Sequence, residues 1–212
     1  MAKNIILIGG GGHCKSVIEV AESAGYNILG IFDMPEEVGD WVLDYKVIGT
    51  DDDISRYADK AEFVIAVGFI KTPAVRIRLY DKIKEAGGKL ATLVASTAYV
   101  SKYADVGEGT VVMHHAMINA GAQIGTNCII NTFCNIEHGA VIGNQCHIST
   151  GTMVNGDCKV GERVFIGSQS VMANGVSIEN DIIVGAGSFI RKSLKEKGIY
   201  SGNPAILKIR GK

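Results

Sequence analysis

The sequence has little proline, little tryptophan and almost no net charge. Only three prolines and one tryptophan occur in 212 residues, and the formal net charge is −1. A protein that neutralises nucleic-acid phosphates carries a basic stripe, and none is present here. We therefore expect a small-molecule substrate and no nucleic-acid partner.

Long hydrophobic runs and cysteine pairs are scarce as well. No segment approaches the roughly 18 apolar residues of a membrane span, and no signal-peptide run follows the first residues. We expect a cytoplasmic location without membrane association. The five cysteines are an odd number without CxxC spacing, which argues against a disulfide framework and against a zinc site.

Glycine, by contrast, is abundant, and it accompanies a strict repeat in the second half of the chain. Seventeen aliphatic residues stand six positions apart from Val94 to Ile190, and all are Val or Ile except Met172. This period fits neither a helix nor an ordinary strand, and it is typical of a parallel β-helix with three flat sides. The sequence predicts that fold for residues 91–212.

The repeat also assigns positions to small residues. Four positions after each aliphatic the side chain is usually small and is expected to point inward. Four cysteines occupy this position: Cys128, Cys134, Cys146 and Cys158. We interpret them as buried packing residues. Glycines directly after the aliphatics, such as Gly107 and Gly125, are expected where the chain bends and a Cβ is costly.

Before residue 90 the repeat is absent, and strands alternate with helices. The predicted strands are 4–8, 28–32 and 63–67, and the predicted helices are 16–24 and 72–86. Such alternation is typical of a parallel sheet with helices on its faces. We therefore predict an α/β, Rossmann-like domain over residues 1–90. Residues 34–47 either line its pocket or form a surface excursion.

A glycine run, Gly9 to Gly12, joins the first strand to the first helix, where backbone N–H groups favour an anion. A dinucleotide fingerprint needs a third glycine where Cys14 or Lys15 stands, which disfavours a nicotinamide cofactor. Two interpretations stay open, a tight turn and a cradle for a nucleotide diphosphate. Asp33, after the second strand, would then bind a ribose or base. His13 is either a ligand contact or a loop residue.

Three stretches together resemble a known family: GGGGHCKSV at 9–17, NTFCNIEHGAVIG at 131–143 and GNPA at 202–205. They are similar to the sialic acid O-acetyltransferase NeuD/PglD-like family of hexapeptide-repeat sugar acetyltransferases, and the likeness covers nearly the whole chain. The resemblance implies a left-handed β-helix and a homotrimer with active sites between subunits. It also implies acetyl-CoA as co-substrate and N-acetylation of a nucleotide-linked 4-amino sugar held by the N-terminal domain.

The resemblance places the catalytic histidine on His138 and a second family histidine on His147. Imidazole, with an unperturbed pKa of about 6.5, can take a proton from an attacking amine at neutral pH. A near relative in this family has an acidic residue where this chain has Gly139, so Glu137 is the candidate substitute, although adjacent residues on a strand face opposite ways. His147 is expected to serve a site completed by a neighbouring subunit.

The sequence pattern and the resemblance together give the remaining site residues. Those expected to bind acetyl-CoA are His147, Gly167, Ser168, Gly185, Ala186, Arg191 and Lys192. Those expected to bind the nucleotide sugar are Gly10, Gly11, Gly12, His13, Asp33, Gly68 and Asn131. Two interpretations stay open for Arg191, Lys192 and Lys195. They contact the phosphates of CoA, or they form an ordinary basic cap at the end of the coil.

Three rival functions are weighed against N-acetylation. His114 and His115 suggest a zinc enzyme similar to the hexapeptide carbonic anhydrases, but those share a histidine pair five positions apart that is missing here, so no metal is expected. An O-acetyltransferase acting on sialic acid or another sugar hydroxyl must deprotonate a weaker acid. It would need an orienting carboxylate that Gly139 does not supply. The third rival is a non-catalytic trimeric scaffold.

Overall fold

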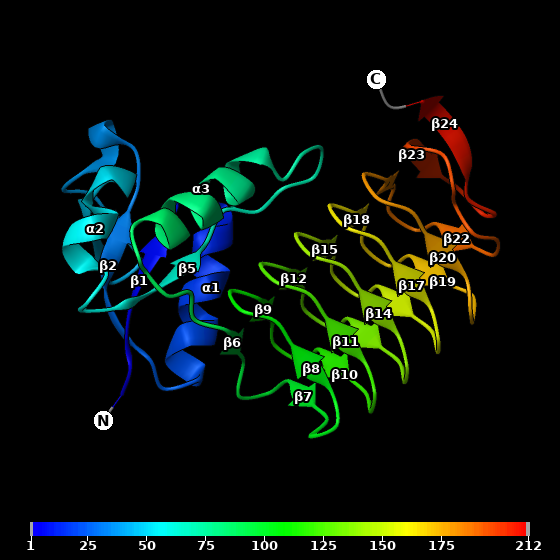
Figure 1. Cartoon of the computed structure of the whole chain (residues 1–212), viewed down its shortest axis with the longest axis horizontal. Coiled ribbons are helices and arrows are strands. Elements are labelled where there is room, and N and C mark those ends of the chain that lie inside the picture. Colours follow the sequence, from blue (N-terminus) through cyan, green and yellow to red (C-terminus); the bar gives the residue numbers. More distant parts are fainter. Residues whose placement is uncertain (1, 211–212) are drawn as a thin grey trace.

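Two architectures follow one another along the chain in the computed structural model, which describes residues 2–210 (Figure 1). The first is an α/β domain. Its elements are β1 (Asn4–Ile8), α1 (Gly12–Ser23), β2 (Asn27–Phe32), η1 (Pro35–Glu37), β3 (Trp41–Val42), β4 (Tyr45–Gly49), η2 (Asp51–Asp53), α2 (Ile54–Tyr57), β5 (Glu62–Ile65) and α3 (Ala74–Glu85).

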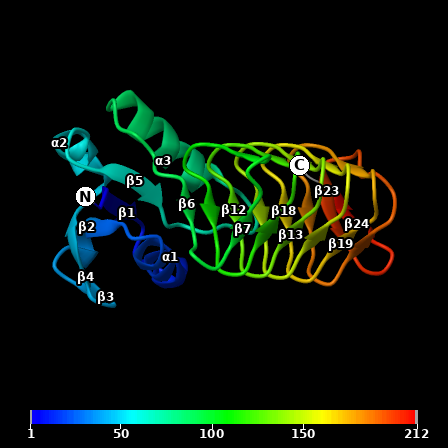
Figure 2. The ribbon, with the colours of Figure 1, turned by 90° about the horizontal axis from the view of Figure 1, so that it is seen from below.

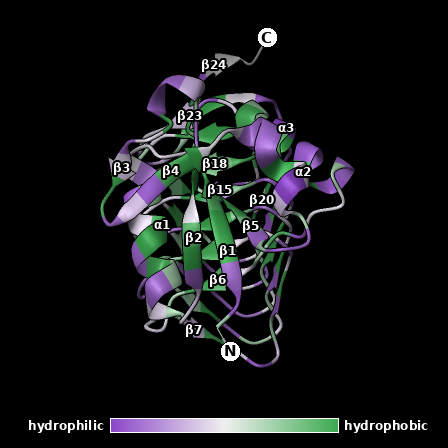
Figure 3. Cartoon of the chain, turned by 90° about the vertical axis from the view of Figure 1, so that its left-hand side faces the viewer, coloured by the Kyte–Doolittle hydropathy of each residue, from purple (hydrophilic) through white to green (hydrophobic). Residues whose placement is uncertain are grey.

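The sheet of this domain has the order β3-β4-β2-β1-β5 and is parallel except for the β3–β4 hairpin. Helices α1 and α3 lie on opposite sides of it, so β1 is covered on both faces (Figure 3). Ile5, Ile6 and Leu7 are accordingly fully buried. Residues 34–47, left open above, include β3 and the start of β4, which extend the sheet at one edge.

Helix α1 has a second contact, with the β-helix. Val17 and Ile18 of α1 belong to the same apolar cluster as Leu93 and Val111 from the first coils. The chain leaves the sheet through the Phe63–Leu90 bridge and enters the coil immediately afterwards. The helix therefore packs between its own sheet and the first coils.

The β-helix consists of two-residue strands, each ending on one of the repeating aliphatics, and partners lie 18 residues apart. The first face contains β6 (Leu93–Val94), β9 (Val111–Val112), β12 (Ile129–Ile130), β15 (His147–Ile148), β18 (Phe165–Ile166) and β21 (Ile183–Val184). The second contains β7 (Tyr99–Val100), β10 (Met117–Ile118), β13 (Asn135–Ile136), β16 (Met153–Val154), β19 (Val171–Met172) and β22 (Phe189–Ile190). The third contains β8 (Asp105–Val106), β11 (Gln123–Ile124), β14 (Val141–Ile142), β17 (Lys159–Val160) and β20 (Ser177–Ile178).

We call the turn after the first face the first corner, the turn after the second face the second corner and the turn after the third face the third corner. The coils stack along one axis beyond the α/β domain, as the view from below shows (Figure 2). At the far end β23 (Gly198–Ser201) continues the first face and β24 (Ile206–Arg210) folds back antiparallel to it. This hairpin covers the last coil.

The corners bend at a position that the sequence prediction did not identify. From Val106 to Val184, the left-handed residue is the third after each aliphatic, for example Asn127 with φ of 51° and Gly139 with φ of 68°. Glycines directly after the aliphatic are needed for a different reason. A Cβ on Gly143 would lie 2.7 Å from the carbonyl carbon of Gly161 in the next coil. Those glycines thus permit close stacking of backbones.

The interior confirms the interpretation of the cysteines. All five are free and buried, and Cys128, Cys134, Cys146 and Cys158 lie in the β-helix core. Burial raises the pKa of the Cys134 thiol to about 12, so it stays protonated. The four cysteines of the β-helix therefore serve as packing residues in its core.

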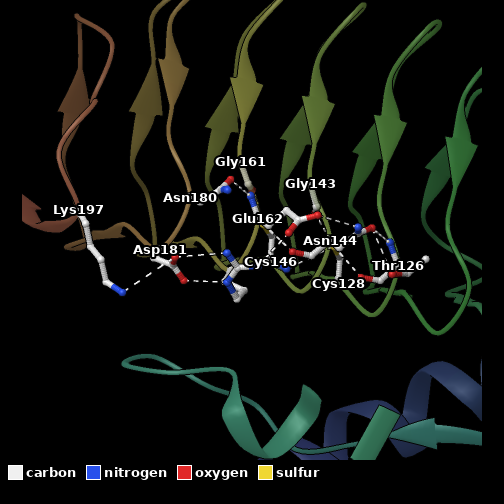
Figure 4. A network of polar contacts seen from close by, with 11 residues as sticks. Thr126, Cys128, Gly143, Asn144, Cys146, Gly161, Glu162, Asn180, Asp181 and Lys197 are labelled. Atoms are coloured by element: carbon white, nitrogen blue, oxygen red, sulfur yellow. Dashed lines mark hydrogen bonds and ion pairs between the residues drawn. The ribbon is translucent and has the colours of Figure 1, made fainter. Parts of the chain in front are cut away.

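Polar side chains stack along the third corner (Figure 4). The Asn144 Oδ1 accepts from the Thr126 N–H at 2.9 Å, and its Nδ2 donates to Glu162 at 3.0 Å. Arg163 donates to Asp181 at 2.8 Å. Side chains at equivalent positions of successive coils are therefore within hydrogen-bonding reach. Across residues 2–210, none of the helices is long and apolar enough to cross a membrane.

Candidate active site

A cavity of about 290 Å³ opens at the carboxyl ends of β1 and β2, where ligands bind in open α/β sheets. Asp33 and Gly9 line it, and Met34 and Arg78 lie at its walls. The Asp33 carboxylate accepts hydrogen bonds from the Gly10 N–H at 2.7 Å and the Met34 N–H at 2.9 Å. The structure therefore brings the glycine turn and Asp33 together.

The glycines of this turn have two different explanations. Gly9 has φ of +101°, and a Cβ on Gly10 would lie 2.7 Å from the Asp33 carboxylate. A Cβ on Gly11 or Gly12 would meet no atom of residues 2–210 within 4 Å. A tight turn alone therefore accounts for the first two glycines and not for the last two, at the start of α1.

His147 lies at the junction between the two domains. Its Nδ1–H donates to the Phe69 carbonyl at 2.8 Å, and its Nε2 accepts from the Asn131 amide at 3.2 Å. The rings of Phe69 and Phe165 pack edge-on against it, and its exposed fraction is 8%. Burial, against the opposing effect of the Phe69 hydrogen bond, lowers the pKa of His147 to about 4. The ring is thus neutral at pH 7 and both nitrogens have partners.

His13 lies beside this ring, with centroids 6.3 Å apart, and packs on Gly68. Burial, and then the charge of Arg76, lower the pKa of His13 to about 4. Its Nε2 is buried and has no hydrogen-bond partner among residues 2–210. The structure thus gathers His13, Gly68, Asn131 and His147, which the sequence assigned to two different ligands, in one place.

Arg76 is a residue that sequence reasoning missed. It is fully buried on α3, and its guanidinium donates to the carbonyls of Ile65 and Val67 at 2.8 and 2.7 Å and to Asn127 at the third corner. This arginine therefore joins the end of β5 to the β-helix. The one signal in the sequence is its spacing from Leu79 and Ile83 on the buried side of α3.

His138 lies at the second corner and is exposed. Its ring lies over Gly156, where a Cβ would be 2.7 Å from Cε1 and 2.8 Å from Nε2. Glu137 accepts from the amides of Asn119 at 2.9 Å and Asn135 at 2.8 Å, and no hydrogen bond joins it to His138 within residues 2–210. The orienting role of Glu137 therefore stays a prediction that no contact with His138 supports.

The positions equivalent to His138 in successive coils of the second corner lead to two cations. The positions equivalent to His138 in the next three coils hold Gly156, Asn174 and Lys192, and Arg191 precedes the last of these. Asn174 and both cations are exposed. Three strand spacings of about 4.8 Å make this path roughly 14 Å long. The corner therefore connects an imidazole to a pair of positive charges.

The other predicted acetyl-CoA residues lie elsewhere, at the first corner. A Cβ on Gly167 would lie 2.8 Å from the carbonyl carbon of Gly185, beside Ala186, and Ser168 shares a hydrogen bond of 2.9 Å with Ser149. The structure thus separates the predicted acetyl-CoA residues into groups at two corners, with His147 on the first face.

The remaining histidines have local partners. His114 shares a hydrogen bond of 2.8 Å with Thr97, and His115 stacks on Phe133 with centroids 4.9 Å apart. In the part of the chain that the structure describes, no group of three or more His, Cys, Asp or Glu side chains is arranged to hold a metal ion.

A β-helix of hexapeptide repeats with an α/β domain in front of it defines a hexapeptide-repeat transferase, and comparisons with known proteins agree. The PglD N-terminal domain family matches residues 4–83, the bacterial transferase hexapeptide family residues 139–174 and the hexapeptide repeat of succinyl-transferase residues 158–192. The chain is similar over its whole length to a histidine-to-asparagine mutant of perosamine N-acetyltransferase from Caulobacter crescentus, solved with CoA and GDP-perosamine. The identity is 31%, the TM-score is 0.90, and the match covers 100% of this chain and 99% of that one.

Two further relatives extend the comparison. The acetyltransferase domain of PglB from Neisseria gonorrhoeae FA1090 is 27% identical with a TM-score of 0.89, over 97% of this chain and all of that one. Uncharacterized protein L142 of Acanthamoeba polyphaga mimivirus is 32% identical over 123 residues, which is 57% of this chain and 23% of that protein. The chain thus spans about a quarter of that curated relative. It belongs to the PglD/NeuD-type family of nucleotide-sugar acetyltransferases, which confirms the resemblance and the fold class expected from the sequence.

Proposed function

We propose that this protein transfers the acetyl group of acetyl-CoA to the amino group of a nucleotide-linked 4-amino sugar, with His138 as the general base. One observation carries the proposal: the chain matches, end to end and at 31% identity, an acetyltransferase solved with CoA and GDP-perosamine. Two features of this structure support the proposal, one for each substrate.

The nucleotide sugar is assigned to the cavity at the end of β1 and β2. Asp33 keeps acceptor capacity after its two backbone hydrogen bonds, because a carboxylate offers about four lone-pair sites. Open space over Gly11 and Gly12, at the N-terminus of α1, suits a diphosphate. These features favour a binding site for a nucleotide diphosphate over a tight turn that only needs glycines.

Acetyl-CoA is assigned to the second corner. Its pantetheine arm contains amide groups and would follow Gly156 and Asn174, where the asparagine side chain offers both a donor and an acceptor. Its phosphates would meet Arg191 and Lys192. The thioester then lies at His138. The amine nitrogen attacks the carbonyl carbon, its proton passes to the imidazole, and CoA leaves as a thiol after taking that proton.

We further propose that the site is completed in a homotrimer. The α/β domain covers the first face, whereas His138 lies at the opposite corner of the triangular coil. The second face bears exposed apolar side chains, with Tyr99 and Met117 exposed by 55% and 43%, and the third bears polar ones such as Gln123. An exposed apolar face beside His138 is suited to a second copy of the chain.

The test is to mix the purified protein with acetyl-CoA and a panel of UDP-, GDP- and dTDP-linked 4-amino sugars, with free sialic acid in parallel, and to follow thiol release. Release with one nucleotide amino sugar, and an acetamido product by mass spectrometry, is expected. Release with sialic acid alone would replace N-acetylation by O-acetylation. Absence of release with every acceptor would contradict the enzymatic proposal.

A further inference from the structure

Resting on the proposed function, we propose that Asp157, one coil beyond the general base, is the residue that positions His138. Asp157 occupies the left-handed position of the second corner, with φ of 59°. The equivalent positions in neighbouring coils are Gly121, Gly139 and Gly175. Among these four, only Asp157 carries a side chain, and it stands diagonally next to His138.

Side chains at the left-handed position reach the equivalent residue one coil away. At the third corner Asn127 donates to Gln145 at 2.6 Å, and Arg163 donates to Asp181 at 2.8 Å. Asp157 extends in the same manner toward the preceding coil. A carboxylate at this position therefore lies over the turn that contains His138.

The contacts of Gly139 show where the carboxylate lies. A Cβ on Gly139 would be 2.4 Å from the Asp157 Oδ1, so the glycine leaves the space that the carboxylate occupies. The His138 ring leans the other way and lies over Gly156, the residue before Asp157. The Asp157 N–H also donates to the His138 carbonyl at 3.0 Å. The imidazole thus lies over the coil of Asp157, and the carboxylate lies over the coil of His138.

Asp157 is available for this role, whereas Glu137 is occupied. Glu137 already accepts hydrogen bonds from two side-chain amides. Within residues 2–210, no hydrogen bond or ion pair engages the Asp157 carboxylate. It shares none with His138, but both side chains are exposed. A rotation of the His138 side chain, when substrate fills the corner, brings the two together, since catalytic hydrogen bonds often tighten only in the complex.

In the proposed pair of His138 and Asp157, the two ring nitrogens of the histidine have different roles. The Asp157 carboxylate accepts the hydrogen bond of one ring N–H, so that the other nitrogen faces the acceptor amine with a free lone pair. When that nitrogen takes the amine proton, the nearby carboxylate stabilises the imidazolium. The proton then passes to the departing sulfur, and Asp157 remains ionised throughout.

The first test replaces Asp157 by Asn, which keeps the shape and removes the charge. We expect kcat to fall about 10- to 100-fold while KM for both substrates stays within about twofold, because the residue acts on the base and not on binding. Asp181→Asn is the matched control. It removes an aspartate from the same turn position at the third corner, and kcat should be unchanged.

The second test moves the carboxylate. Asp157→Gly should lose as much turnover as Asp157→Asn, and Gly139→Asp in the same protein should restore most of it. Aspartate tolerates the left-handed conformation of Gly139 better than most residues. Wild-type kcat in Asp157→Asn, or no recovery in the double variant, would overturn the role of Asp157 alone. If the wild-type protein shows no turnover with any nucleotide amino sugar, the proposed function is contradicted as well.

Discussion

His138 and His147 lie nine residues apart and have opposite surroundings. His147 is buried between Phe69 and Phe165, and hydrogen bonds to both nitrogens leave it no free lone pair. His138 is exposed and lies over a glycine. A base must offer a free nitrogen to its substrate, so the structure supports catalysis by His138 and a connecting role for His147.

Replacement of His138 by Ala should therefore reduce kcat roughly 10²- to 10⁴-fold, the range of general-base catalysis. The exposed ring is not part of the hydrophobic core, so its removal should leave the fold intact. Binding of CoA, measured by calorimetry, should therefore be retained. His114→Ala, which removes a histidine bound to Thr97 at the first corner, is the control and should leave kcat unchanged. Turnover of His138→Ala near the wild-type value would exclude His138 as the base.

The buried histidines should make stability sensitive to mild acid. In the folded state the pKa of His147 and that of His13 are lowered to about 4, whereas unfolding returns each to about 6.5. Between these values the unfolded chain binds more protons, so stability falls as the pH drops from about 6.5 towards 4. Each histidine contributes up to roughly 1.4 kcal/mol per pH unit.

His147→Gln tests this linkage, because an amide can still donate to the Phe69 carbonyl but does not titrate. We expect this variant to have a lower melting temperature at pH 7 and a flatter decline between pH 6.5 and 4.5. The measurement is the melting temperature as a function of pH. An equally steep decline in the variant would assign the acid sensitivity to other groups.

At the level of elements, the sequence predicts what is repeated or periodic. Every hexad aliphatic ends a strand, because one inward position per side must be apolar. The helix predicted for 72–86 is observed as Ala74–Glu85, and the one predicted for 16–24 begins earlier, at Gly12. That start has no side-chain cap, so the usual signal for a helix beginning is missing.

Elements and contacts without a period were not predicted. The β3–β4 hairpin depends on pairing with β2, which no local pattern reports. The left-handed corner position was missed because Asn127, Phe133, Asp157 and others occupy it as well as glycine. Stacking between coils, and not local preference, holds these residues in that conformation.

The corners make a stability prediction. Gly143→Ala places a methyl group 2.7 Å from the backbone of Gly161, and a coil cannot shift without disturbing its neighbours, so we expect a loss of about 1–3 kcal/mol. Gly175→Asn is the matched control. Its φ is +68°, nothing lies within 4 Å, and Asn127 adopts the same conformation in this protein, so the cost should be small. The measurement is the unfolding midpoint of each variant. Equal midpoints would contradict close stacking.

At the level of the molecule, the parts of the site come from segments far apart in the sequence. The position of His138 on the outer side of the coil follows from its register, and Asp33 and the glycine turn follow from the order of strand and helix. The contacts of Arg76 with Asn127, and of His147 with Phe69, cross between the two domains. No pattern within one domain reports such a contact. These contacts hold the α/β domain against the first face, away from the corner that bears His138.

This separation predicts that activity depends on assembly. Met117 lies on the second face, beside Tyr99 in the neighbouring strand, and Met117→Glu places a charge on the face of the proposed subunit contact. Burying an unpaired carboxylate is costly, so we expect the variant to dissociate and to lose turnover with its circular dichroism unchanged. Gln123→Glu places the same charge on the polar third face and should stay assembled and active. Light scattering gives the mass and thiol release the activity. A dissociated Met117→Glu protein with full turnover would show that one chain contains the complete site, and an assembled one would place the subunit contact on another face.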